Sequence, residues 1–236
     1  MIETKKKTIH IYDDNIGSVS LVDSMGSDIT VVNSARVSFG IEKEELNERD
    51  RKLINYLISH RHTSTLEHNL ITFKFCVPLF VRSQHHRHRT WSYNEISRRY
   101  TSRDMQFYLP STFHSQHKSN RQASDLNTLI NPEIYDTSAA QFMKEYCASA
   151  LEAYEELISS GIAREQARMI LPQNLYTEYY GTVNLNNLLK FIDLRTHEGA
   201  QWEIQKVAEA CLDIATDLFP ITVGSYRKIR REVEPS

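Results

Sequence analysis

Apolar residues follow strand-like patterns in the first third of the chain. Residues 18–24 and 70–77 (LITFKFCV) are rich in β-branched and aromatic side chains, which favour β-strands. Residues 28–38 (DITVVNSARVS) have a similar β-branched content, and we expect a further strand there. The polar stretch HRHTSTLEHN, residues 60–69, predicts a turn that leads into the 70–77 strand.

A spacing of three and four residues between apolar positions predicts helices elsewhere. Apolar residues of the segment 45–60 fall on one helical face. A longer stripe over 143–158 predicts a helix that begins near Thr137 and ends at Gly161, a residue suited to the left-handed turn after a helix. Three more helices are predicted at IAREQARMIL before Pro172, at NLNNLLKFIDLR, and at AQWEIQKVAEACLDIATDLF before Pro220.

Pro78 precedes another predicted helix, which carries several candidate functional residues. Its missing N–H does no harm in a first helical turn, so we expect a helix from Leu79 to Arg89. Positions separated by three, four and seven residues would then share one face of this helix. Those positions are Gln84, Arg87, His88 and Trp91.

Residues 110–137 are polar and poor in large apolar groups, and we expect a long surface loop or lid there. No Gly/Ser-rich linker divides the chain. The mixture of strands and helices therefore predicts a single α+β domain over residues 1–236, with a polar loop around 110–137.

Composition narrows the class of protein. The net charge of −2 and the pI of about 6.6 differ from those of a dedicated nucleic-acid-binding domain. The N-terminus MIETKKKTIHIYDD lacks the apolar stretch of a signal peptide, and no segment approaches the ~20 apolar residues of a membrane span. The three cysteines Cys76, Cys147 and Cys211 lie in apolar contexts without a CxxC motif, which is typical of reduced, buried thiols. We expect a cytoplasmic protein that does not contact membranes.

The segment RHRTWSYNEISRRY, residues 87–100, mixes arginines with Trp91 and Tyr93. Arginine offers paired donors to phosphate oxygens, and a neighbouring histidine adds a hydrogen bond. A compact anion with a flat ring, such as a nucleotide or a dinucleotide cofactor, fits this mixture. The chain has seven glycines and no GxGxxG or GxxxxGK[ST] loop, so side chains and helix ends would have to hold the phosphates.

Two other interpretations of this region are less favourable. Histidines cluster at residues 60–68 and 85–88, but Arg87 and Arg89 would repel a divalent metal ion from the second cluster. The arginines and aromatic residues would also suit stacking against single-stranded RNA. That is the best non-enzymatic hypothesis, but the basic residues are confined to one segment of a negatively charged chain. We therefore expect neither a metal site nor a nucleic acid polymer as partner.

Arg87-His88-Arg89, seven further residues and Ser97 together resemble the RHRx7S signature of flavin-dependent thymidylate synthases. HTSTLEH (62–68), AREQARMILPQNLYTEYYGTVN (163–184) and LRTHEGAQWEI (194–204) resemble other elements of that family. The resemblance implies methylation of dUMP at C5 to give dTMP. Methylenetetrahydrofolate would supply the one-carbon unit, and FAD reduced by NADPH would supply the hydride. It also implies a central antiparallel sheet surrounded by helices, and a homotetramer whose active sites are shared between subunits.

The resemblance further assigns roles to positions of this sequence. The implied FAD-binding residues are Ser64, Arg87, His88, Arg89, Glu95, Asn184, Asn186 and Lys190. The implied dUMP-binding residues are Gln84, His85, His86, Arg87, Glu95, Ile96, Ser97, Arg98, Arg99, Arg168 and Arg195. His62 matches a histidine near the flavin, although it would serve equally as an ordinary loop histidine.

Arg195 is the candidate catalytic residue because it matches the arginine beside the uracil ring. A fixed cation there would stabilise the negative charge that makes C5 nucleophilic. Without the resemblance, Arg195 would be interpreted as a helix C-terminal arginine that stabilises the helix dipole. Ser97 has no adjacent base to activate it and is assigned to binding.

Some positions depart from the family pattern. Arg98 stands where many members have glycine within a Ser-Gly-Arg triplet. Asn186 and Lys190 replace residues near the adenine end of FAD, and Gly199 replaces a histidine found in some relatives. These differences concern FAD affinity more than the reaction. The apolar contexts of the three cysteines should raise their thiol pKa values, so we do not expect a cysteine to activate the uracil.

Overall fold

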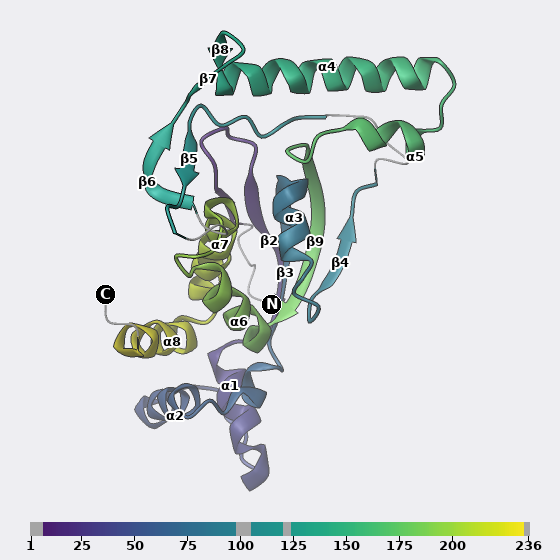
Figure 1. Cartoon of the computed structure of the whole chain (residues 1–236). Helices are drawn as coiled ribbons and strands as arrows, with labels where there is room; N and C mark the ends of the chain where they lie inside the picture. Colours follow the sequence, from purple (N-terminus) through teal and green to yellow (C-terminus); the bar gives the residue numbers. More distant parts are fainter. Residues whose placement is uncertain (1–6, 98–104, 120–123, 234–236) are drawn as a thin grey trace.

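The computed structural model describes residues 7–97, 105–119 and 124–233, and a five-stranded sheet lies at its centre (Figure 1). The strand order is β1-β2-β3-β9-β4, and every neighbouring pair is antiparallel. The strands are β1 Thr8–His10, β2 Ser18–Met25, β3 Leu70–Pro78, β9 Tyr176–Asn184 and β4 Ser92–Glu95. This sheet with its flanking helices confirms the predicted α+β fold.

Helices pack around the sheet and across its ends (Figure 1). Those nearest the sheet are α3 Leu79–His85, α6 Leu185–Arg195 and α7 Trp202–Leu218. At one end lie α1 Asp28–Arg36, the short helix η1 Val37–Phe39, α2 Glu48–Ser59, η2 Thr63–Leu66 and α8 Pro220–Val233. At the other end lie α4 Ala139–Ser159, α5 Arg164–Ala167 and η3 Arg168–Ile170.

The main core forms between the sheet and the helices. Alternate residues of β3 point to one face, and Phe73 and Phe75 are fully buried there. Phe191 of α6 reaches the same region, where its ring centroid lies 5.4 Å from that of Trp91. Burying several aromatic rings supplies much of the hydrophobic stabilisation, at roughly 25 cal/mol per Å² of apolar surface removed from water.

The strands predicted at 18–24 and 70–77 and the helices predicted at 143–158 and 184–195 are confirmed. The helix expected over 45–60 begins at Glu48, because the side chain of Asn47 accepts hydrogen bonds from two N–H groups of the first turn. Local signals were sufficient at these segments because each apolar pattern matches the face that the tertiary structure buries.

The strand predicted at 28–38 is wrong, since these residues form α1 and η1. The carboxylate of Asp28 accepts hydrogen bonds from the backbone N–H groups of Ile221 and Thr222, each at 2.9 Å, and so ties the start of α1 to α8. Val31 and Val32 are fully buried on the helix. Tertiary contacts thus override the strand preference of the β-branched residues.

The helix predicted over 79–89 is also wrong in length, because α3 ends at His85. The next residues form tight turns, with the N–H of His88 donating to the carbonyl of His85 at 3.0 Å. The chain then enters β4, which pairs with β9 along the edge of the sheet. Gln84, Arg87, His88 and Trp91 therefore do not share one helical face.

The loop predicted over 110–137 contains two small hairpins instead. They pair β5 Phe113–Gln116 with β6 Ser124–Ile130, and β7 Glu133–Ile134 with β8 Thr137–Ser138. The sequence-based prediction also missed β9 and α8. Pro220, which was expected to end the preceding helix, is also the first residue of α8. In the described part of the chain, no helix is both long and apolar enough to cross a membrane.

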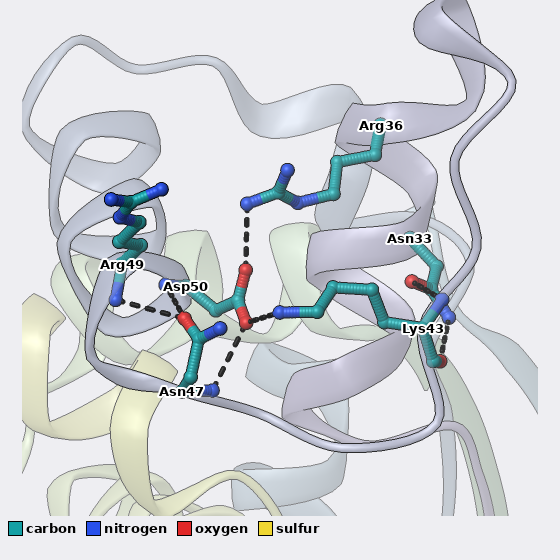
Figure 2. A network of polar contacts seen from close by, with 6 residues as sticks. All are labelled: Asn33, Arg36, Lys43, Asn47, Arg49 and Asp50. Atoms are coloured by element: carbon teal, nitrogen blue, oxygen red, sulfur yellow. Dashed lines mark hydrogen bonds and ion pairs between the residues drawn. The ribbon is translucent and has the colours of Figure 1, made fainter.

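A buried carboxylate fixes the segment between α1 and α2 (Figure 2). Asp50 is fully buried, and its carboxylate accepts hydrogen bonds from Arg36 at 2.7 Å, from Lys43, and from the backbone N–H of Asn47 at 3.0 Å. Burial by itself would raise the pKa of this carboxyl, but these donors hold the pKa below its usual value. The network immobilises α1, whose Ser34 and Ala35 line the cavity described below.

Candidate active site

Arg195 is the last residue of α6, and the helix itself fixes where it lies. The Oδ1 of Asn184 caps the helix by accepting from the N–H of Asn187 at 2.9 Å. Leu188 and Phe191 anchor the helix in the core with no exposed surface. The side chain of Arg195 then donates from Nε to Nε2 of His88 at 3.0 Å, and from Nη2 to the carbonyl oxygen of Gln84 at 3.4 Å.

His88 is held on several sides. Its ring meets that of Phe191 edge to face, with centroids 4.9 Å apart. The hydroxyl of Tyr93 donates to the carbonyl oxygens of His85 at 3.0 Å and of His88 at 3.2 Å, which secures the turn after α3. Burial and the nearby Arg195 guanidinium lower the pKa of His88 to about 4, so its imidazole is neutral at pH 7.

Positive charge accumulates around Arg195, and no carboxylate in the described part of the chain forms an ion pair with it. Burial and the nearby Arg87 lower the pKa of Arg195 below its usual value. Arg87 and Arg89 are exposed, and their side chains make no hydrogen bond or ion pair with any described residue. Guanidinium groups that lie close together repel one another, and a bound anion would relieve this repulsion; phosphate suits their paired donors.

Two histidines next to this cluster differ in exposure. His85 is fully buried and shares a hydrogen bond of 2.8 Å with the hydroxyl of Tyr179. Burial lowers its pKa well below the usual range. Any contact between His85 and a nucleotide would have to come from its main chain. His86 is half-buried and stacks on Tyr93, with ring centroids 4.1 Å apart.

The edge strand β4 carries a second group of predicted residues. The Oε1 of Glu95 accepts from the Nε of Arg82 at 3.1 Å and from the hydroxyl of Thr177 at 2.7 Å. The N–H of Ile96 donates to the carbonyl of Glu178 at 2.9 Å, and its side chain is exposed, as Ser97 is in part. Arg98 and Arg99 lie outside the described residues.

The predicted residues are spread along the sheet. Glu95 lies opposite Tyr179 in β9, whereas Asn184 is the last residue of that strand. Five residues at ~3.3 Å each therefore separate Glu95 from Asn184 by about 17 Å along the sheet. Arg168 is exposed in η3, beyond the beginning of β9, while Arg195 lies with α6 toward the other end (Figure 1). One chain therefore does not gather all predicted positions at a single point.

Several residues predicted to bind FAD lie near the end of the sheet where β9 leads into α6. Ser64 is exposed in η2 and lines a cavity of about 520 Å³ together with His62, Ser34 and Ala35. Asn186 is buried, and its amide donates to the carboxylate of Glu67 at 2.8 Å. Lys190 is exposed on α6.

Folding adds residues that the sequence patterns did not single out. Gln201 accepts a hydrogen bond from the amide of Gln84, and Thr177 supports Glu95. Both belong to segments that resemble family elements, but no local pattern showed which residue each would meet. Among the described residues, no group of three or more His, Cys, Asp or Glu side chains is arranged to hold a metal ion.

The chain is similar to several known proteins. Residues 20–221 match the family model described as thymidylate synthase complementing protein. The flavin-dependent thymidylate synthase of Thermus thermophilus is 42% identical, over 94% of this chain and 78% of the relative. The corresponding enzyme of Thermotoga neapolitana is 40% identical, over 90% of this chain and 91% of the relative. A UMP/dUMP methylase, PolB from Streptomyces cacaoi bound with 5-Br dUMP, superposes with a TM-score of 0.77 at 35% identity, covering 89% of this chain and 94% of that one.

Proposed function

The chain belongs to the family of flavin-dependent thymidylate synthases, and we propose that its reaction centre is built around Arg195, His88 and Gln84. The reaction is the reductive methylation of dUMP to dTMP, and FAD supplies the hydride when it is bound. NADPH and methylenetetrahydrofolate are the usual co-substrates of this family.

The positive charge of Arg195 and Arg87, which pairs with no carboxylate of a described residue, is the observation that carries the proposal. Burial strengthens the field of the Arg195 guanidinium, because fewer water molecules screen it. A uracil ring that meets this guanidinium would be stabilised as it gains negative charge, which raises the nucleophilicity of C5. The helix dipole alone would not account for the hydrogen bonds that turn Arg195 toward His88 and Gln84.

The residues present fit a flavin dinucleotide. Arg87 and Arg89 leave two exposed guanidinium groups available for the pyrophosphate. The Oδ1 of Asn184 caps α6, which leaves its amide N–H groups for the cofactor. Ser64 and Lys190 are exposed, so both side chains are accessible to a ligand. Asn186 is buried against Glu67 and would act by holding η2 to α6 rather than by direct contact.

The separation of the predicted dUMP residues supports a site shared between subunits. The first group is Arg168 in η3, beyond the beginning of β9, and the second is Gln84 and Arg195, which meet where α3 and α6 end. A second copy of the chain that brings the first group to the second would complete one nucleotide site. We propose that such contacts build a homotetramer. The free thiols Cys76, Cys147 and Cys211 suit the reducing cytoplasm, where we place the enzyme.

The variant Arg195→Ala tests this function directly. The purified protein should be yellow with FAD, and the variant should retain the flavin absorption bands while dTMP formation is abolished. Arg87→Ala should weaken both flavin and dUMP binding, because its position serves both ligands. Turnover of dUMP by Arg195→Ala at the wild-type rate would remove Arg195 from the reaction centre and leave it only a helix-dipole role.

A further inference from the structure

His88 accepts the hydrogen bond from the Nε of Arg195, and we infer that His88 is the positioning residue that aims this guanidinium at the uracil. The inference rests on the proposed role of Arg195. It gives His88 a task separate from the cofactor contact implied by its place in the motif.

Two hydrogen bonds determine the orientation of the Arg195 side chain. Nε donates to the His88 imidazole at 3.0 Å, and Nη2 donates to the carbonyl oxygen of Gln84 at 3.4 Å. Because the guanidinium group is planar, two bonds from different nitrogens fix both its position and its plane. Nη1 has no hydrogen-bond partner among the described residues, so its N–H groups remain for a ligand.

An imidazole suits this position better than a carboxylate would. A carboxylate would orient Arg195 but would also neutralise it, and would therefore weaken its attraction for developing negative charge. The low pKa of His88, about 4, keeps its ring neutral at pH 7 while Nε2 accepts a hydrogen bond. His88 thus aims the guanidinium and leaves its full charge to the substrate.

The surroundings of His88 make it rigid enough for this role. The Phe191 ring packs against it at 4.9 Å, and Phe191 belongs to the same helix as Arg195. Tyr93 and the N–H of Trp91 both donate to the His88 carbonyl, at 3.2 and 3.4 Å. The imidazole and the guanidinium are therefore fixed to one frame, which a positioning pair requires.

Two replacements of His88 separate orientation from packing. His88→Phe keeps a flat ring but removes the acceptor, and we expect kcat for dTMP formation to fall roughly 100-fold. His88→Gln places an amide oxygen near the former Nε2, and we expect it to recover kcat to within about tenfold of wild type. Calorimetric titration of dUMP into the oxidised, FAD-loaded protein should show a Kd change below about threefold, because orientation matters most as the ring gains charge. The control variant is His10→Phe, the same exchange on β1 at the opposite edge of the sheet. It should leave kcat for dTMP formation and Kd for dUMP unchanged.

A double-mutant cycle shows whether His88 acts through Arg195. Arg195→Lys removes the Nε–H that His88 accepts, so adding His88→Phe to that variant should lower kcat by less than about threefold. Losses that multiply would overturn the inference, as would full recovery of kcat in His88→Phe at saturating FAD. A failure of the proposed function would give another result. Arg195→Ala would then form dTMP at the wild-type rate, whatever the kcat of the His88 variants.

Discussion

The imidazole of His85 and the hydroxyl of Tyr179 share a hydrogen bond of 2.8 Å in the interior of the protein. Both side chains are almost completely buried, and the second ring nitrogen of His85, Nε2, has no hydrogen-bond partner among the described residues. This pair joins α3 to β9 directly beneath the turn that carries Arg87 and His88.

Removing one partner of this pair should be more harmful than removing both. Tyr179→Phe leaves His85 with two unpaired nitrogens, so we expect the free energy of unfolding to fall by about 1–3 kcal/mol. The double variant His85→Phe/Tyr179→Phe replaces both polar groups by rings and should recover most of that loss. Urea unfolding of the three proteins measures the effect. Equal stability of Tyr179→Phe and wild type would show that the hydrogen bond contributes nothing.

Stability should decrease as the pH falls below about 6.5, the ordinary histidine pKa. Burial lowers the pKa values of His85, His86 and His88 in the folded protein, and that of His88 to about 4. Between pH 6.5 and 4 the unfolded chain therefore binds more protons than the folded one, and stability rises with pH. Thermal unfolding across this range should show the trend, with a shallower slope for His88→Gln and no change of slope for Arg195→Lys. A flat profile would contradict it.

Mixed oligomers should recover activity if subunits share the site. Arg195→Ala and Arg168→Ala should each be inactive alone, because each lacks one dUMP contact. Random co-assembly would give about a quarter of the sites both intact arginines when these come from different chains. Co-expression followed by an assay for dTMP measures the recovery. The matched control combines Arg195→Ala with Gln84→Ala, which lie at the same place and should not complement. No recovery in either mixture would refute the shared site.

Replacing all three cysteines should leave methylation largely intact. Burial and the neighbouring Glu178 raise the pKa of Cys76 to about 11, and burial raises the pKa values of Cys147 and Cys211. None therefore supplies a thiolate at neutral pH to attack the uracil. We expect a stability loss on the order of 1 kcal/mol per buried site because packing changes. A folded triple variant without turnover, rescued by one restored cysteine, would transfer the activating role from Arg195 to that thiol.

Much of the fold was predictable where burial follows a simple local period. The strand at 70–77 and the helix over 143–158 were predicted correctly, since their apolar residues alone define the face that meets the core. The same reasoning failed at 28–38, because Asp28 bonds to α8 almost two hundred positions later and stabilises a helix. It made no prediction for residues 92–95, which form a strand by pairing with β9 along the edge of the sheet.

The candidate site divides in a similar way. The chemistry of the basic segment, and its likeness to a known signature, are properties of the order of residues and could be recognised without a structure. The surroundings of each charged side chain, in contrast, cannot be recognised from the order of residues. Arg195 meets His88 across 107 positions of the chain, and Arg87 lies near it; neither cation forms an ion pair with a carboxylate among residues 7–97, 105–119 and 124–233. Electrostatic energies depend on distance and on the water that burial removes, and both are set only when α6 packs against the turn after α3.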